Sequence, residues 1–238
     1  MNLVMLFEED FVAPDRVVLR DRRLAHICRV HRAMVGDELR VGLLQGAVGS
    51  ARIEQLSEHQ ATLAVTLLEA PPVPLPVTLV MALPRPKMLR RCLQMVAEMG
   101  IKRLYLINSV RVEKSFWLSP LLQPQKIREH LVLGLEQSRD TQLPEVHLRS
   151  RFKPFVEDEL PGLIDGGTGL LAHPSAAGLE HPRLPLTGES LLCIGPEGGF
   201  VPYEVDKIAC AGCRLISLGA RIYRVETALP LLIGRLFI

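Results

Sequence analysis

Two segments near the C-terminal end of the chain carry residues whose types and spacing could do chemistry. The first reads C-I-G-P-E-G-G-F at positions 193–200, and its three glycines lie within five residues. Glycine has no Cβ, so backbone N–H and C=O groups can approach a ligand closely. The spacing fits neither G-x-G-x-x-G nor G-x-x-x-x-G-K-[ST], which excludes both nucleotide-phosphate fingerprints. The segment predicts either a ligand-binding loop or a tight turn from a strand into a helix.

The second segment reads L-G-A-R-I-Y-R-V-E-T-A at positions 218–228. Arg221, Arg224 and Glu226 are spaced along a loop ahead of an apolar helix, which Thr227 is expected to cap, with Pro230 at its third position. Two cations beside a carboxylate at a helix N-terminus indicate either an anion clamp with a base or a structural ion pair.

Cysteine and histidine are arranged too sparsely to predict a metal site. Cys210 and Cys213 form one C-x-x-C, and His26, Cys28 and His31 lie far upstream. Structural zinc needs four converging ligands, so packed thiols are the expectation and no metal is predicted. Five cysteines, an odd number, also argue against a disulfide framework and for a reducing compartment.

The elements that must position the two segments alternate between strand and helix. A proline-rich stretch at 71–76 predicts a stiff linker. After it we expect strands at 77–83, 103–107, 145–148, 169–172, 191–194 and 214–218, and helices at 87–99, 120–137, 202–211 and 227–237. Ser119 is expected to cap the second helix, and Gly100 to follow the first in a left-handed conformation. This alternation predicts an α/β domain over 77–238 with a mainly parallel sheet, whose carboxyl edge carries the glycine-rich loop.

The first 70 residues have a different pattern. Short β-like runs occur at 3–7, 17–19, 38–44, 47–55 and 61–68, with one short helix at 22–30. Five strands and one helix predict a small β-barrel, a shape common among RNA-binding modules.

Charge is nearly balanced overall, at +2, but it is unevenly distributed. Six arginines and one acid lie within 16–35, and eight basic residues and two acids lie within 85–114. These stretches predict either phosphate-binding surfaces or solvated faces. The N-terminus lacks the pattern of a signal peptide, and no run of 18 apolar residues occurs, so we expect a cytoplasmic protein with no membrane partner.

Taken together, the two C-terminal segments resemble the 16S ribosomal RNA uracil-N3 methyltransferases, a branch of the SPOUT superfamily. A G-P-E-G-G loop and an L-G-x-R-I-x-R-x-E-T-A segment occur there in the same order. The similarity extends to E-Q-S at 136–138, A-E-M-G at 97–100 and Arg111, and more weakly to His26 and Gly36-Asp37.

The resemblance implies a trefoil-knot α/β methyltransferase domain, an N-terminal PUA-like β-barrel, and a homodimer formed through the knot domain. It implies S-adenosylmethionine as cofactor, held in the knot loops. The cofactor-binding residues that it implies are Leu171, Ala172, His173, Gly195, Glu197, Gly198, Gly199, Leu218, Gly219, Ile222 and Arg224. The expected partner is 16S ribosomal RNA or the small ribosomal subunit, contacted by Arg20, Arg23, Arg29, Arg32, Arg111 and Arg139.

Methylating N3 of uracil requires removal of a weakly acidic imide proton, since the neutral nitrogen has no lone pair aimed at the methyl group. Glu226 is the carboxylate placed by sequence to accept that proton, and His173 is the second candidate. Arg221 and Arg224 could stabilise the uracil anion or hold a phosphate. The alternative for Glu226 is that it orients Arg224.

Several positions depart from the family pattern. Met95 replaces a lysine, Arg139-Asp140 follow E-Q-S in place of a glycine, Ala220 replaces a proline and Val225 a threonine. A paralogue acting on another uridine therefore stays open, as do a catalytically silent RNA-binding or ribosome assembly factor and an α/β enzyme for a different nucleotide-like ligand.

Overall fold

The computed structural model describes residues 2–174, 185–186 and 188–237. The chain divides into two compact units: Met1–Val73 with Val132–Leu143, and Pro74–Leu131 with Pro144–Ile238. The sequence predicted boundaries at 70 and 76 and assigned 132–143 to the second domain. Backbone hydrogen bonds explain the difference, because Asn2 and Leu3 donate to the Glu136 carbonyl and Gln45 donates to the Thr141 carbonyl.

The first unit is built on a six-stranded sheet with the order β1-β4-β5-β6-β3-β2. Its strands are β1 (Val4–Leu6), β2 (Phe11–Ala13), β3 (Arg16–Leu19), β4 (Glu38–Leu43), β5 (Val48–Leu56) and β6 (Ala61–Glu69). The pair β1–β4 is parallel and the other pairs are antiparallel. Helix α1 (Arg22–His26) continues into a π-helical turn, Ile27–His31. All five predicted strands and the helix are present; β2, three residues long, was missed.

Arg23 belongs to the interior of this unit, which contradicts its expected role in RNA binding. Its side chain is 4% exposed, and its guanidinium donates to Asp10 (2.7 Å), to Asp21 (2.8 Å) and to the Met5 carbonyl (2.7 Å). A guanidinium with these three partners cannot also bind phosphate. The sequence shows the charge of a residue but not its burial, so Arg23 was predicted to contact RNA together with the exposed arginines.

The second unit contains a six-stranded sheet with the order β12-β10-β11-β7-β8-β9, and every neighbouring pair in it is parallel. Its strands are β7 (Val77–Ala82), β8 (Arg103–Ile107), β9 (Glu145–Arg149), β10 (Thr168–Ala172), β11 (Ser190–Ile194) and β12 (Cys213–Ile216). The central strands β7 and β11 are buried along their whole length, as expected for a parallel sheet covered on both faces. The predicted α/β architecture is confirmed.

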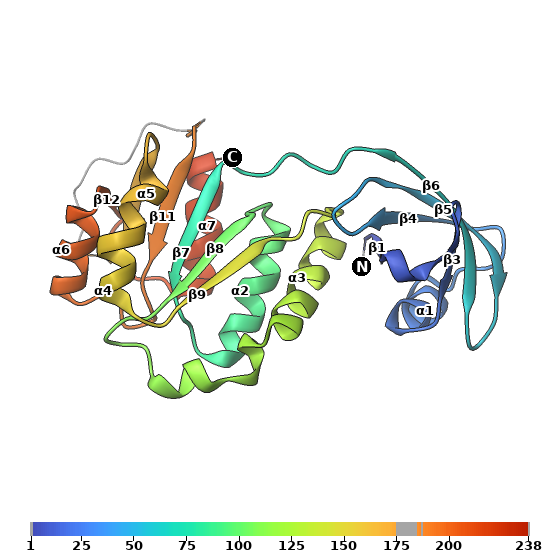
Figure 1. The fold of residues 1–238 in the computed structure, drawn as a ribbon, viewed down its shortest axis with the longest axis horizontal. Helices are drawn as coiled ribbons and strands as arrows, with labels where there is room; N and C mark the ends of the chain where they lie inside the picture. Colours follow the sequence, from blue (N-terminus) through green and yellow to red (C-terminus); the bar gives the residue numbers. More distant parts are fainter. Residues whose placement is uncertain (1, 175–184, 187, 238) are drawn as a thin grey trace. The chain divides into compact units, whose positions relative to one another are not determined.

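Helices cover the two faces of this sheet (Figure 1). Helices α2 (Pro86–Glu98) and α7 (Val225–Phe237) contact each other on one face. Helix α6 (Pro202–Cys210) lies on the other face beside a helical segment at 152–164, made of α4 (Phe152–Pro154), a π-helical turn and α5 (Leu160–Ile164). That helical segment was not predicted. Gly100 follows α2 with φ +73°, which confirms the predicted left-handed position.

Two helix starts differ from the prediction. Ser119 accepts a hydrogen bond from the Leu121 amide, but it caps only a 3-10 turn, Pro120–Leu122. Helix α3 (Pro124–Ser138) begins later because Gln123, which precedes a proline, is extended.

Helix α7 begins at Val225, so Thr227 is not its cap. The Arg224 carbonyl already accepts from the amides of Thr227 and Ala228, and Pro230 therefore lies inside the helix. Among the described residues, no helix has the length and apolar character needed to cross a membrane.

Candidate functional site

The carboxyl ends of three neighbouring parallel strands meet at one point of the second unit. In the sheet register, Ala172 at the end of β10 is paired with Ile194 of β11 on one side and with Ile216 of β12 on the other. The loops that follow these strands therefore leave the sheet side by side, which is where open α/β sheets bind ligands. They enclose a cavity of about 450 Å³.

The glycine-rich loop forms one wall of this cavity. The Gly199 amide donates to the Pro196 carbonyl over 2.7 Å, and Gly199 has φ +73°, a conformation that L-residues avoid. A Cβ on Gly195 would lie 3.1 Å from both the ring and the amide nitrogen of Phe200. The clearance is tighter than most Cβ contacts, so a side chain at Gly195 would crowd Phe200, and the loop presents its backbone to the cavity.

Arg111 comes from the loop after β8 and packs against the same wall. Its guanidinium donates to the Gly198 carbonyl, and a Cβ on Gly198 would lie 2.9 Å from the Arg111 Cδ. Arg111 was predicted to bind RNA; the structure places it in the lining of the cavity.

Glu204, which was not among the residues predicted from the sequence, holds the Arg111 loop in position. This carboxylate is 1% exposed and accepts hydrogen bonds from the amides of Val201 (3.0 Å) and Val110 (2.8 Å) and from Ser109 Oγ (3.2 Å). It thereby joins the end of the glycine-rich loop to the loop carrying Arg111. The sequence does contain a hint, because Pro202 followed by Glu204 is typical of the first turn of a helix.

The segment 217–224 forms the opposite wall together with α7. Ser217 Oγ accepts from the Gly219 amide over 3.1 Å, and Gly219 has φ +97°. Arg221 lines the cavity beside Ile222, which is 80% exposed. Apolar side chains from α7 complete the wall: Val225, Ala228 and Leu232.

Most of the expected cofactor-binding residues line this cavity: Ala172, His173, Gly195, Glu197, Gly198, Gly199, Leu218 and Ile222. Leu171, Gly219 and Arg224 are not among the lining residues, and Leu171 is fully buried within β10. The His173 amide donates to the Ile216 carbonyl, and its Nε2 lies 3.3 Å from the Phe200 carbonyl oxygen. His173 therefore joins the loop after β10 to the last residue of β12 and to the loop after β11.

Of the three expected catalytic residues, only Arg221 lines the cavity. Arg224 is exposed, and the partly buried Glu226 lies in the first turn of α7. Burial, together with the negative charges of Glu226 and Glu197, raises the pKa of the Cys92 thiol on α2 to about 12. Helix α7, whose first turn carries Glu226, contacts α2.

The expected RNA-contacting arginines of the first unit lie in different environments. Arg29 and Arg32 are exposed, and Arg20 donates to Gln60 Oε1 over 3.2 Å. Arg139, in the segment grouped with this unit, is exposed and has φ +61°. Arg23, as described above, is buried.

The cysteines and histidines considered for zinc do not converge. Within the described part of the chain, no group of three or more His, Cys, Asp or Glu side chains could hold a metal ion. Cys210 is exposed, whereas the buried Cys213 lies 4.0 Å, sulfur to sulfur, from Cys193. His26 and His31 contact each other ring to ring.

Comparisons with known proteins agree with this arrangement. A family model described as an RNA methyltransferase domain matches residues 71–236. The ribosomal RNA small subunit methyltransferase E of Treponema pallidum is 33% identical over 233 residues, which are 96% of this chain and 87% of that protein. The enzyme of the same name from a Synechocystis species is 29% identical, over 91% of this chain and 73% of its own length.

Solved structures share the fold. One is a ribosomal RNA small subunit methyltransferase E from Neisseria gonorrhoeae bound to S-adenosylmethionine, with a TM-score of 0.74 and 21% identity over 98% of this chain and 95% of that one. A probable rRNA methyltransferase from Porphyromonas gingivalis has a TM-score of 0.72 and 23% identity over 97% and 95% of the two chains.

Proposed function

This chain belongs to the RNA methyltransferase family, and we propose that it transfers a methyl group from S-adenosylmethionine to N3 of a uridine in 16S ribosomal RNA. The observation that carries the proposal is the glycine-lined cavity at the carboxyl ends of β10, β11 and β12. Its wall contains the two segments, at 193–200 and 218–228, by which the sequence resembles the uracil-N3 methyltransferases.

The residues around the cavity fit the proposed cofactor. A cavity of about 450 Å³ is within the usual range for small-molecule sites, roughly 300–1,000 Å³. Ile194, Ile216 and Leu232 offer apolar contacts for a nucleoside base, and the loop at 195–199, which has glycine at 195, 198 and 199, offers backbone polar groups. When bound, S-adenosylmethionine supplies the electrophilic methyl group.

The protein must then orient the uracil, remove the N3 proton and stabilise the anion that results. Arg221 lines the cavity and is the cation placed to stabilise the anion. The proton acceptor must reach the reacting nitrogen, directly or through one water. His173 lines the cavity and Glu226 does not, so we propose His173 as the acceptor and Glu226 as a residue that positions the start of α7 and Arg224.

The resemblance also carries finer proposals about architecture. We propose an α/β knot in the second unit; the support is a chain path that places β11 between β10 and β7 and then β12 on the far side of β10. We propose a PUA-like barrel for residues 1–70, joined by the 71–76 linker; the six-stranded mixed sheet supports it. A homodimer formed through the knot domain and a cytoplasmic location follow from the family resemblance, and light scattering of the purified protein tests the dimer.

Nucleoside mass spectrometry of ribosomal RNA tests the function. A strain lacking this protein should lose one N3-methyluridine from its 16S RNA, and the purified enzyme with S-adenosylmethionine should restore it. Loss of methylation at a uridine of another RNA would identify a paralogue. A protein that binds RNA but shows no calorimetric binding of S-adenosylmethionine would refute the methyltransferase proposal and favour an assembly factor.

A further inference from the structure

In the second unit, the edge of the parallel sheet at which its strands end differs in charge from the edge at which they begin. Because all six strands run the same way, the loops after the strands share the edge that holds the cavity. Among the described residues, the loops and first helical turns at this edge carry the following basic side chains: Arg85, Lys87, Arg111, Lys114, Arg151, Lys153, Arg221 and Arg224. The acidic residues there are fewer, namely Glu113, Glu197, Glu204 and Glu226, and Glu204 is buried.

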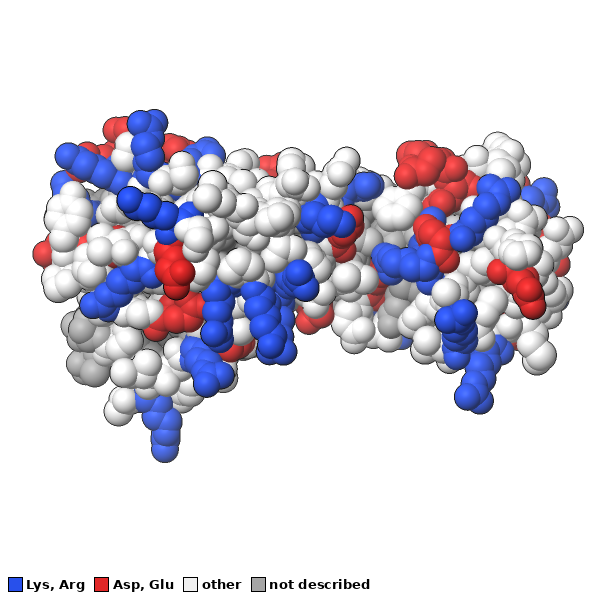
Figure 2. Space-filling model, turned by 90° about the horizontal axis from the view of Figure 1, so that it is seen from below, with Lys and Arg blue, Asp and Glu red and all other residues white. Residues whose placement is uncertain are grey.

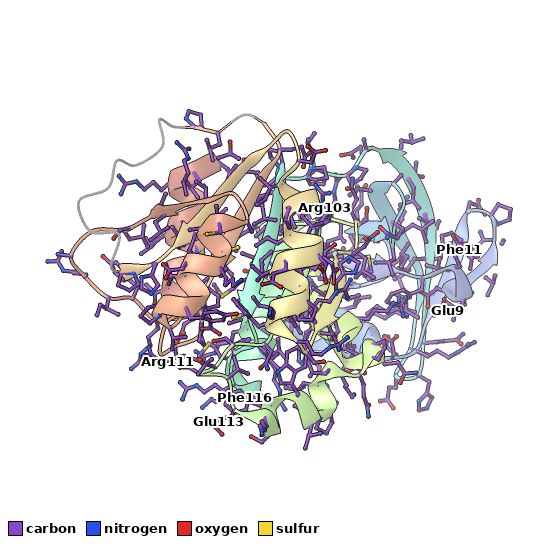
Figure 3. All side chains as sticks on the ribbon, turned by 60° about the vertical axis from the view of Figure 1, so that its left-hand side comes forward. Glu9, Phe11, Arg103, Arg111, Glu113 and Phe116 are labelled. Atoms are coloured by element: carbon purple, nitrogen blue, oxygen red, sulfur yellow. The ribbon has the colours of Figure 1, made fainter. Side chains whose placement is uncertain are left out.

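The opposite edge lacks this excess. Its described charged residues before or at the strand starts are Lys102, Arg103, Glu145, Asp165 and Glu189. Figure 2 views the second unit, at left, from the side of the cavity edge, and shows more blue than red side chains on this face. Figure 3 shows Arg111, Glu113 and Phe116 together at the cavity edge and Arg103 at the other.

Some of the basic residues of this unit are ion-paired and others are not. At the cavity edge, Arg85 lies 3.9 Å from Glu197 and Lys153 lies 3.9 Å from Glu157. Away from the cavity edge, Arg103 pairs with Glu189 (2.6 Å), Lys126 with Glu129 (2.9 Å) and Lys207 with Glu157 (2.6 Å). At the cavity edge, Lys87, Lys114 and Arg151 are exposed and make no ion pair with any described residue. Charges that folding leaves unneutralised on one edge create a field that attracts an anionic partner.

We infer that this edge is a phosphate-binding surface, formed by Lys87, Lys114 and Arg151, which holds the backbone of the RNA strand whose base enters the cavity. The three residues follow β7, β8 and β9, whereas the cavity follows β10, β11 and β12. The surface therefore extends the site along the sheet edge. A single nucleotide would contact only the cavity, whereas a strand of RNA is long enough to contact the surface as well. Exposed Val110 (73%) and Ile222 (80%) at the same edge provide apolar contacts for bases beside the target. This inference rests on the proposed function and names where its substrate is held.

The test compares two triple variants of the full-length protein. Lys87→Ala, Lys114→Ala and Arg151→Ala remove three unpaired charges, and Arg103→Ala, Lys126→Ala and Lys207→Ala remove three paired ones from the same unit. The probe is transcribed small-subunit ribosomal RNA, titrated over a range of salt concentrations. Each lost phosphate contact should lower the slope of log K against log salt by about 0.7, and three should weaken binding roughly 50-fold at about 0.15 M salt.

The control triple variant should change the salt slope and the RNA affinity little. The affinity for S-adenosylmethionine should be unchanged in both triple variants. Equal salt slopes for the wild type and the edge triple would overturn the inference, even if the wild type methylates RNA. Unchanged affinity for free RNA with lost affinity for the assembled small subunit would also overturn it, since the edge would then contact a ribosomal protein. A wild type that binds RNA through this edge without binding S-adenosylmethionine would refute the proposed function and leave the surface intact.

Discussion

The buried carboxylate of Glu204 connects the two loops that build the cavity wall, and its removal should damage stability and cofactor binding together. Its Oε1 accepts from the Val110 amide, and its Oε2 accepts from the Val201 amide and Ser109 Oγ. In Glu204→Gln, one oxygen becomes an NH2 group, which donates. Whichever way the amide is turned, that donor faces a backbone N–H.

The magnitude follows from these contacts. The hydroxyl of Ser109 can rotate, so the least damaging orientation leaves one partly buried backbone N–H without an acceptor, which costs about 1–3 kcal/mol. A second hydrogen bond loses its charged acceptor and weakens by roughly 1 kcal/mol. We expect Glu204→Gln to lower the free energy of unfolding by about 2–4 kcal/mol, measured by urea denaturation.

Glu157→Gln is the matched control, because it makes the same chemical change in an exposed carboxylate of the same unit. Glu157 pairs with Lys207 over 2.6 Å at the surface, where solvent screening leaves such a pair only a small effect on the free energy of unfolding. Calorimetry at a temperature where both variants are folded should show weaker binding of S-adenosylmethionine by Glu204→Gln only, since Arg111 loses its support against Gly198. Equal unfolding free energies and equal cofactor affinities in the two variants would refute this reasoning.

Three further predictions concern residues whose environment the structure has defined. Arg23→Met should lower the free energy of unfolding by about 3–5 kcal/mol in urea denaturation, because Asp10 is left as a buried, unpaired charge. Arg139→Gly should raise it by about 1 kcal/mol in the same assay, because Arg139 has φ +61° at the end of α3, where glycine is unstrained. In single-turnover methylation, His173→Ala should slow the reaction on the order of 10²-fold at saturating cofactor, whereas Glu226→Gln should act mainly through the affinity for cofactor.

Each of these has an outcome that contradicts it. Arg20→Met is the control for Arg23→Met, because Arg20 is exposed and Gln60 is its hydrogen-bond partner among the described residues; equal destabilisation of the two would show that the buried ion pair adds nothing to stability. If Arg139→Gly lowers the free energy of unfolding, the contacts of the arginine side chain stabilise the protein by more than its backbone strain destabilises it. If Glu226→Gln lowers the single-turnover rate and leaves cofactor affinity unchanged, Glu226 and not His173 is the proton acceptor.

Much of the fold was predictable, because local pattern and overall architecture agree in this chain. Apolar runs such as 77–83 and 191–194 predicted the buried central strands, and the alternation of strand and helix predicted a parallel sheet. The helical segment at 152–164 escaped prediction because it contains Pro154 and Pro161 and begins as a short turn, so no long periodic pattern marks it. The late start of α3 depended on a single proline, Pro124, whose effect on Gln123 outweighed the capping signal of Ser119.

The candidate site was predictable to the extent that it depends on backbone. Glycines at 195, 198 and 199 predicted a loop that a ligand can approach, and this prediction did not depend on the order of the strands. Residues that act through a partner distant in sequence were not predictable. Arg111 was predicted only as an RNA contact, and Glu204 was not predicted. Arg111 lies 87 residues before Gly198 and Val110 lies 94 before Glu204, and only the adjacency of strands brings them together.

Sequence by itself determined the types of chemistry available: a glycine loop, two arginines, a carboxylate and a histidine, with the family that this combination resembles. Tertiary structure decided which of them share a cavity. Arg221 and His173 line the cavity, and Glu226 is not among the lining residues. Arg23, which was predicted to contact RNA, forms a buried ion pair. The physical reason is that type and spacing fix what a side chain can do, whereas burial and electrostatic partners depend on which strands become neighbours in the sheet.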